Sequence, residues 1–264
     1  MTFESHLKSL GKSDNTIVAY LHTIKLFNES FSEINENSIA AFKTFLIDNY
    51  HPRTVNLRIS AMNAYLKYSG QPIRMSSIRY QQQTYLDNVI SLADYECLKN
   101  GLLSDENLLW YYIVRFLGST GSRINELLQF KVEHIRIGYV DIYSKGGKIR
   151  RIYIPLLLQI DAMRWLDSIG KYTGPLFVNS KGNILSAKGI SSQLKKLAVR
   201  YGIDPSVVYP HSFRHMFAKT FMQRYNDIAL LADLLGHESI ETTRIYLRMS
   251  SNEQREIVNQ TVDW

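Results

Sequence analysis

The 264-residue chain contains one cysteine, Cys97, so it cannot form a disulfide within itself. The sequence also gives this cysteine no partner at the spacing of a metal site. A fold that depends on disulfides is therefore excluded. A reducing compartment is the natural setting for such a chain.

Long hydrophobic runs are also missing. No stretch reaches the roughly 18 apolar residues that a membrane-spanning helix needs. The first residues, MTFESHLKSLGKS, lack the apolar core of a signal peptide. We therefore expect a soluble, intracellular protein that does not contact a membrane.

Acidic residues are the minority among the charged ones. Lys and Arg number 31 against 24 Asp and Glu, which gives a formal net charge of +7. An excess of this size suits a polyanionic partner. The sequence has no internal repeat or low-complexity tract, and its length allows one large domain or two smaller ones.

Helical periodicity fills the first 70 residues. Ser13 is a suitable N-cap for a helix over 13–28, and further helices are expected over 37–48 and from Pro52 to Gly70. The third helix has a polar face made by Arg53, Thr54, Asn56, Arg58 and Asn63. Such a face is either simply solvated or suited to following phosphates.

A polar stretch with little periodicity follows Gly70. It predicts a linker over residues 73–90 between a helical domain at 1–72 and a larger domain at 91–264. In the larger domain, GYVDIYSKGGKIRRIYIP predicts a β-hairpin with a glycine-bearing turn. Helices are expected there at 156–168, 187–201, 212–224, 227–235 and 240–249. The expected fold class is mainly α: a small helical domain plus a larger α+β domain with a small antiparallel sheet.

Basic and imidazole side chains recur where packing does not require them. Arg123 follows a glycine turn in TGSRINEL and begins a helix, where a cation opposes the helix dipole. Glu126 is placed to brace its guanidinium. Lys145 lies in the turn of the hairpin. Each of these residues alone also has a simpler interpretation as a solvated surface charge.

Two further stretches carry histidines. In PHSFRHMFA, His211 and Arg214 are three residues apart and so share a helical turn. In LLGHESIETTRIYL, His237 follows a glycine helix stop, and Tyr246 lies nine residues later on a short helix capped by Ser239. Taken alone, Tyr246 is a half-buried packing residue and His237 part of a surface turn.

Motifs for metals and nucleotides are absent. His211 and His215 have the i,i+4 spacing that zinc sites also use, but HExxH and a cysteine pair are missing. SKGGK is not a phosphate loop, because GxxxxGK[ST] is absent. No carboxylate cluster is placed to hold Mg²⁺.

The remaining inventory is two arginines, a lysine, two histidines and a tyrosine, which suits metal-free attack on a phosphodiester. Two guanidiniums can clamp the non-bridging oxygens as charge grows in the transition state. A tyrosine, with a free pKa of about 10, needs a nearby base and a cationic environment to act as nucleophile. A lysine or histidine can protonate the departing 5′ oxygen.

These stretches resemble the tyrosine site-specific recombinases, also called phage integrases. TGSRINEL resembles the first-arginine box of that family, SKGGKIRRIYIP its lysine hairpin, HSFRHMFA its HxxRH box and LLGHESIETTRIY its closing box. The catalytic set that the resemblance implies is Arg123, Lys145, His211, Arg214, His237 and Tyr246. Small departures at Phe213, Lys219 and Gln129-Phe130 do not affect this set.

In the scheme that the resemblance implies, the two arginines bind the scissile phosphate and Lys145 is the general acid. His211 acts as acid or base near the nucleophile, His237 hydrogen-bonds the phosphate, and Tyr246 attacks it. The product is a 3′-phosphotyrosyl bond, and its phosphate is then transferred to the 5′-hydroxyl of a partner strand. Because the bond energy is kept, no cofactor is expected, neither metal nor ATP.

The resemblance also implies an assembly. The N-terminal helices resemble a core-binding domain that closes a C-shaped clamp on DNA, in the compact Cre/Xer-like form without an arm-binding domain. The expected partners are double-stranded DNA carrying a recombination site, three further copies in a homo-tetramer on synapsed DNA, and accessory DNA-bending factors. Residues 251–264 are expected to form a tail helix that docks on a neighbouring copy. The expected location is the cytoplasm, at the nucleoid, in a protein of prokaryotic, viral or mobile-element origin.

Two alternatives stay open at this point. A type IB topoisomerase-like enzyme would use similar chemistry as a monomer on one duplex, and sequence-specific synapsis of two sites separates it from a recombinase. A catalytically inactive DNA-binding accessory factor is the other alternative, and the filling of all the catalytic positions argues against it. A metal-dependent nuclease fits less well, because no carboxylate pair is placed for it.

Overall fold

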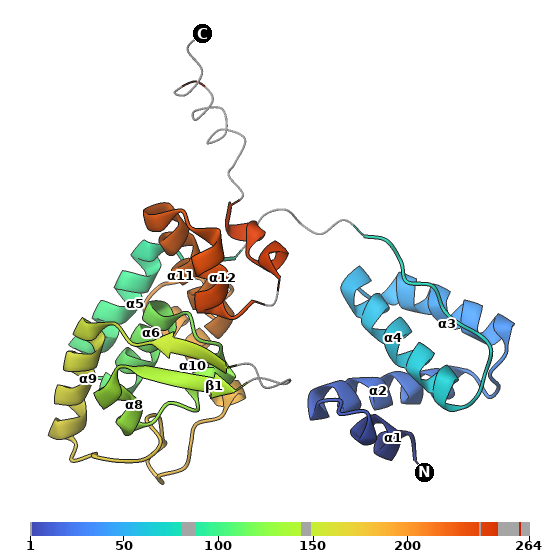
Figure 1. Ribbon diagram of the computed structural model, residues 1–264, viewed down its shortest axis with the longest axis horizontal. Helices are drawn as coiled ribbons and strands as arrows, with labels where there is room; N and C mark the ends of the chain where they lie inside the picture. Colours follow the sequence, from blue (N-terminus) through green and yellow to red (C-terminus); the bar gives the residue numbers. More distant parts are fainter. Residues whose placement is uncertain (1, 81–87, 144–148, 238, 248–258, 260–264) are drawn as a thin grey trace. The chain divides into compact units, whose positions relative to one another are not determined.

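A computed structural model describes residues 2–80, 88–143, 149–237, 239–247 and 259 (Figure 1). The chain divides into two compact units, Met1–Gln82 and Gln83–Trp264. The described residues are mainly helical, with one two-stranded antiparallel sheet, which confirms the predicted fold class. Among these residues, no helix is both long and apolar enough to span a bilayer.

The first unit is helical in its described part. Its elements are α1 (Phe3–Ser9), α2 (Asp14–Ser30), α3 (Glu36–Asn49) and α4 (Pro52–Tyr68). Ser13 caps α2 as predicted, because its side chain accepts a hydrogen bond from the Thr16 amide. The apolar stripes of the helices meet in a core that includes Phe27, Phe42 and Met62. The helix α1 is an addition to the predicted set.

Residues 73–78 differ from the predicted linker, because they pack on the first unit. Met75 is buried in its core. The Asn63 amide group donates to the Met75 carbonyl at 2.9 Å and accepts from the Met75 amide at 2.8 Å. Asn56 makes the same pair of bonds with Ile78, at 2.9 Å each. These two side chains of the polar face of α4 therefore bind the protein's own backbone.

The second unit is larger and contains the sheet. Its elements are α5 (Leu92–Ser104), α6 (Leu108–Thr120), α7 (Ile124–Leu127), α8 (Val132–Ile137), β1 (Tyr139–Tyr143), β2 (Ile149–Tyr153), α9 (Leu156–Ser168), α10 (Ala187–Arg200), α11 (Pro210–Tyr225), α12 (Ile228–Leu235), and the 3₁₀ turns η1 (Ile240–Thr242) and η2 (Arg244–Leu247). The strands form the predicted antiparallel pair, with Val140 opposite Ile152. The turn between them, with Lys145, lies outside the described residues.

The helix α6 runs through the core of this unit, and its residues Ile113, Val114 and Phe116 are fully buried. It ends at Gly121, whose φ of 58° is left-handed. A Cβ at Gly121 would lie 2.6 Å from the Phe217 ring of α11. Only glycine therefore allows this close approach of α6 to α11.

For the segment after α12, the predicted caps are confirmed and the predicted helix type is wrong. Gly236 ends α12 in the left-handed conformation, with φ of 62°, as predicted. Ser239 is the predicted N-cap, but its side chain accepts from the Glu241 amide at 3.3 Å to begin a 3₁₀ turn. Residues 240–247 thus form two 3₁₀ turns in place of the predicted α-helix, and residues 248–249 lie outside the described part.

Candidate active site

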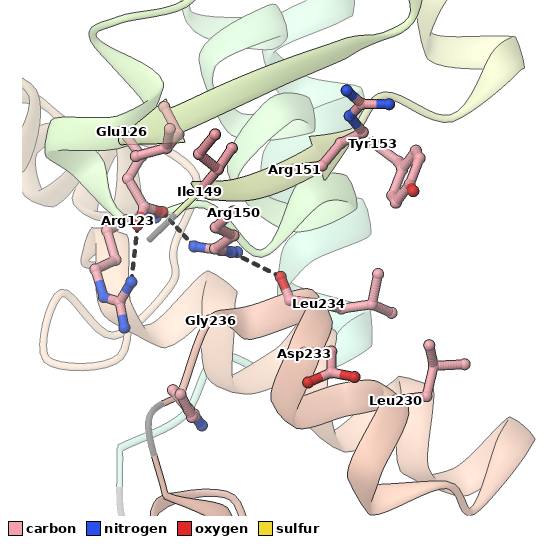
Figure 2. Close-up of a pocket in the computed structure, with 12 residues that line it drawn as sticks. Arg123, Glu126, Ile149, Arg150, Arg151, Tyr153, Leu230, Asp233, Leu234 and Gly236 are labelled. Atoms are coloured by element: carbon pink, nitrogen blue, oxygen red, sulfur yellow. Dashed lines mark hydrogen bonds and ion pairs between the residues drawn. The ribbon is translucent and has the colours of Figure 1, made fainter. Parts of the chain in front are cut away.

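Glu126 joins two arginines at one edge of the site (Figure 2). Arg123 is the N-cap of α7, and its Nη1 donates to Glu126 Oε1 at 2.8 Å. Arg150 of β2 donates from Nη1 to Glu126 Oε2 at 2.7 Å and from Nε to the Leu234 carbonyl of α12 at 2.8 Å. The Glu126 side chain is 9% exposed and that of Arg123 is 43% exposed. Arg123 is therefore braced by Glu126 and still open to solvent.

Arg150 also fits against the end of α12. A Cβ at Gly236 would overlap the Arg150 side chain, so the glycine gives this arginine its room as well as ending the helix. Burial disfavours a charged Glu126, but the charge of Arg150 and the hydrogen bonds from Arg123 outweigh it and lower the pKa of Glu126. The carboxylate is thus ionised and joins α7 to β2, and Arg150 in turn joins β2 to α12.

Arg214 is the most deeply buried charge of the site, at 1% exposure. Its Nη1 donates to the Gly121 carbonyl at 2.7 Å and its Nη2 to the Leu235 carbonyl at 2.6 Å. Its Nε is buried without a hydrogen-bond partner. Burial, followed by the charges of Arg123 and Arg150, lowers the pKa of Arg214 to about 9, so the guanidinium is still charged at pH 7.

His237 lies between Arg214 and Thr243. Its Nε2 is 3.0 Å from Nη2 of Arg214, and its Nδ1 is 2.8 Å from Oγ1 of Thr243. Since Arg214 can only donate, Nε2 accepts its hydrogen bond. Nδ1 then carries the proton and donates a hydrogen bond to the threonine hydroxyl. Burial and the nearby arginines lower the pKa of His237 to about 4, which agrees with a neutral ring.

Tyr246 of η2 faces α11. Its hydroxyl is 2.7 Å from Nδ1 of His215, and the two rings are 5.6 Å apart. Burial raises the pKa of Tyr246 to about 12 against the opposing effects of Arg214 and Arg123. In this state the phenol therefore keeps its proton at neutral pH.

His211 lies one helical turn before His215 on α11. The two imidazole rings are 4.6 Å apart and nearly perpendicular. His211 as a whole residue is exposed. Partial desolvation of its ring, followed by the charges of Arg214 and Arg123, lowers its pKa.

Comparison with known proteins identifies the family. The profile of the phage integrase family matches residues 93–253. Tyrosine recombinase XerA of Pyrococcus furiosus is 30% identical over 268 residues, which cover 98% of this chain and 92% of that protein. Tyrosine recombinase XerD of Staphylococcus saprophyticus subsp. saprophyticus is 30% identical over 293 residues, with 97% of each chain covered. The chain belongs to the phage integrase family of tyrosine recombinases.

Two solved recombinase structures share the fold of this tyrosine recombinase. A lambda integrase dimer bound to a COC′ core site has a TM-score of 0.72 at 18% identity and covers 93% of both chains. The crystal structure of XerA recombinase has a TM-score of 0.57 at 23% identity, with 99% of this chain and 97% of that chain covered.

The recombinase fold brings together the predicted site residues that are described. Arg214 binds the Gly121 carbonyl two residues before Arg123, and His237 contacts Arg214 directly. The charges of both arginines act on His211 and Tyr246. Their catalytic roles stay predictions. Lys145 lies outside the described residues, and its assignment as general acid stays a prediction too.

Two residues of the recombinase site were missed from the sequence. His215 stands in the HxxRH box and was considered only as half of a zinc pair, yet it contacts Tyr246. Arg150 was not among the predicted site residues, yet its side chain is buried against Glu126. The strand register offered a signal, since Arg150 lies opposite the buried Ile142 and so on the inner face of the hairpin. No group of three metal-ligating side chains occurs among the described residues.

Proposed function

We propose that this tyrosine recombinase cleaves and rejoins double-stranded DNA at a specific site, with Tyr246 as the nucleophile. The observation that supports the assignment is the position of its hydroxyl, which is 2.7 Å from an imidazole on the same helix as the buried Arg214. A phenol packed only for stability would not require a buried cation beside it, because an isolated buried charge is costly.

In this proposal Arg123 and Arg214 bind the non-bridging oxygens of the scissile phosphate. The exposed part of the Arg123 guanidinium and the unpartnered Nε of Arg214 are the donors available for it. His237, whose Nε2 now accepts from Arg214, adds a hydrogen bond when its ring is protonated or its tautomer changes. Negative charge that develops on the phosphate is thereby stabilised by groups already in place.

The proposed covalent steps are a transesterification and its reverse. The Tyr246 oxygen gives up its proton to a base and forms a bond to phosphorus while the bond from phosphorus to the 5′ oxygen breaks. The leaving oxygen takes a proton from the general acid, which we assign to Lys145. Attack by the 5′-hydroxyl of a partner strand reverses the step and frees the tyrosine. No metal or nucleotide is needed for the balance, because the phosphotyrosine keeps the bond energy.

The proposal extends to the assembly. One related structure is a lambda integrase tetramer bound to a Holliday junction. We infer a tetramer of this chain on two paired sites, with residues 1–72 as the core-binding domain, residues 91–264 as the catalytic domain and 251–264 docking on a neighbour. Accessory DNA-bending factors are further expected partners. The proposed place of action is the cytoplasm.

The test is a nicked suicide substrate that lets the 5′ fragment diffuse away. The wild-type chain should accumulate a covalent protein–DNA adduct, and peptide mapping should locate the DNA on Tyr246. Tyr246→Phe should abolish the adduct and keep half-site binding, because only the hydroxyl is removed. An adduct that persists in the Phe variant would assign the nucleophile to another residue.

A further inference from the structure

The hydroxyl of Tyr246 has one hydrogen-bond partner among the described residues, and that partner is His215. The contact joins η2 to α11 across 31 residues of sequence, at 2.7 Å between Oη and Nδ1. His211, the histidine of the same helix for which the family resemblance implies an acid/base role, contacts the His215 ring and makes no hydrogen bond to the hydroxyl.

The direction of this hydrogen bond follows from the surroundings. The imidazole of His215 is half-buried and lies near His211 and Arg214, and these conditions lower its pKa to about 4. The ring is therefore neutral at pH 7, while the phenol keeps its proton. Tyr246 consequently donates, and Nδ1 of His215 accepts. An acceptor within 3 Å of the attacking oxygen has the geometry required of a general base.

We propose that His215 is the catalytic proton acceptor for Tyr246, an inference that rests on the proposed function of Tyr246 as nucleophile. As the Tyr246 oxygen bonds to phosphorus, its proton passes to Nδ1 of His215. The 5′ oxygen leaves with a proton from the separate general acid. In the rejoining step, protonated His215 returns the proton to the departing Tyr246 oxygen, so both directions are balanced.

Substrate binding strengthens this base. In the free protein the positive charge of Arg214 opposes a proton on His215, and the charges of Arg214 and Arg123 favour a phenolate at Tyr246. A phosphodiester bound between the two arginines adds a negative charge that offsets theirs. The imidazole therefore gains basicity when the substrate is present, and the proton moves as the oxygen attacks.

The experiment uses single-turnover cleavage of the suicide substrate by the full chain with three variants. His215→Ala removes the acceptor. His215→Asn places an amide oxygen near the position of Nδ1, which can accept a hydrogen bond but cannot take up the proton. His134→Ala is the matched control, because His134 also accepts at Nδ1, from the Lys131 amide, on α8 away from the site.

Both His215 variants should cleave slower by about 10²- to 10⁴-fold at unchanged half-site binding, the usual contribution of a positioned base. Added imidazole should restore much of the rate of His215→Ala and leave His134→Ala at the wild-type rate. A wild-type rate in His215→Asn with a slow His215→Ala would mean that the histidine only positions the hydroxyl. A wild-type rate in His215→Ala would also overturn the proposal.

If His215→Ala unfolds, the pH dependence of the cleavage rate tests the proposal instead. Wild-type cleavage should fall on the acid side as His215 becomes protonated, and His215→Asn should lose that limb. His211 and Arg214, whose charges act on His215, and the nearby His237 and Arg123 are kept in both proteins, so the difference reports His215. An identical acid limb in both would overturn the proposal. Tyr246→Phe in the same assay separates the two claims. A covalent adduct in Tyr246→Phe would contradict the role of Tyr246 as nucleophile. A wild-type cleavage rate in the His215 variants, together with an inactive Tyr246→Phe, would contradict only the role of His215 as base.

Discussion

The two units bury different kinds of side chain. In the first unit, Thr23 is the one polar residue among the buried ones described, and its hydroxyl bonds to the Ala19 carbonyl of its own helix at 2.9 Å. In the described part of the second unit, the buried polar residues are Thr120, Ser122, Glu126, Ser212, Arg214 and Thr243. These residues lie in or next to the site, so buried polarity alone locates it.

This difference separates two ways of using burial. An apolar core such as that around Phe42 gains stability from every group it removes from water. A buried guanidinium such as that of Arg214 loses its hydration, and only well-placed hydrogen-bond acceptors compensate for that loss. Burial of a charge costs stability, but it holds the charge in a fixed position before DNA binds, as the proposed stabilisation of the transition state requires.

The strongest test of this comparison is Glu126→Ala. The change leaves the Arg150 guanidinium, 9% exposed, without its counter-charge, and Arg123 without its brace. Removal of one partner from a buried pair typically costs about 3 to 5 kcal/mol. Urea unfolding followed by tryptophan fluorescence should show this loss, because the tryptophans, Trp110, Trp165 and Trp264, all belong to the second unit.

Glu4→Ala in the first unit is the matched control, since it also removes a glutamate from an ion pair. The Lys8 and Glu4 side chains are 59% and 48% exposed, and solvent screens such a pair. Because the tryptophans lie in the second unit, the stability of the first unit is measured by hydrogen exchange at its helix amides, and it should not change measurably. Equal losses from both substitutions would contradict the difference between the units.

Acid should weaken the second unit, in an effect smaller than that of Glu126→Ala. The pKa values of His215 and His237 lie at about 4 in the folded chain, below the ordinary 6.5. Between these values the unfolded chain binds more protons, so stability falls as the pH drops from about 6.5 towards 4. One proton contributes at most about 1.4 kcal/mol per pH unit, and less here because solvent reaches both rings.

The measurement is the urea midpoint of the second unit at pH values from 5 to 7. Glu126, whose pKa is lowered, adds its own loss only below the ordinary carboxylate range, so this window reports the histidines. His215→Asn should flatten the dependence. A slope unchanged by that substitution would show that His215 titrates alike in the folded and unfolded chain.

Local sequence signals predicted the regular elements well. The caps at Ser13, Gly236 and Ser239 were found because each rests on one residue and its immediate neighbours. The brace from Glu126 to Arg123 was found for the same reason. Partners far apart in the sequence were not predicted, such as Arg150 with Leu234 and His215 with Tyr246.

The packing of residues 73–78 on the first unit was not predicted, for the same reason. Residues 73–78 are polar and aperiodic, which is typical of a linker, and nothing local shows that Met75 is buried. The polar face of α4 offered two interpretations, solvation or phosphate contact. For Asn56 and Asn63 neither holds, since both bind backbone of this segment.

The smallest expected effect tests these amides. Asn63→Ala removes both hydrogen bonds to Met75 and leaves its backbone groups to find water, at a cost of about 1 to 3 kcal/mol. Asn63→Asp keeps the acceptor and removes the donor, so its loss should be intermediate. Asn49→Ala is the control, because that exposed amide donates only to the Phe45 carbonyl of its own helix at 2.9 Å.

Hydrogen exchange at the Met75 and Ile78 amides should quicken in the Asn63 variants and stay slow in Asn49→Ala, since release of the segment starts where its side-chain clamp is lost. Slow exchange at Met75 in Asn63→Ala would mean that burial of the methionine side chain alone holds residues 73–78 on the first unit, and that the polar face of α4 is free for another role.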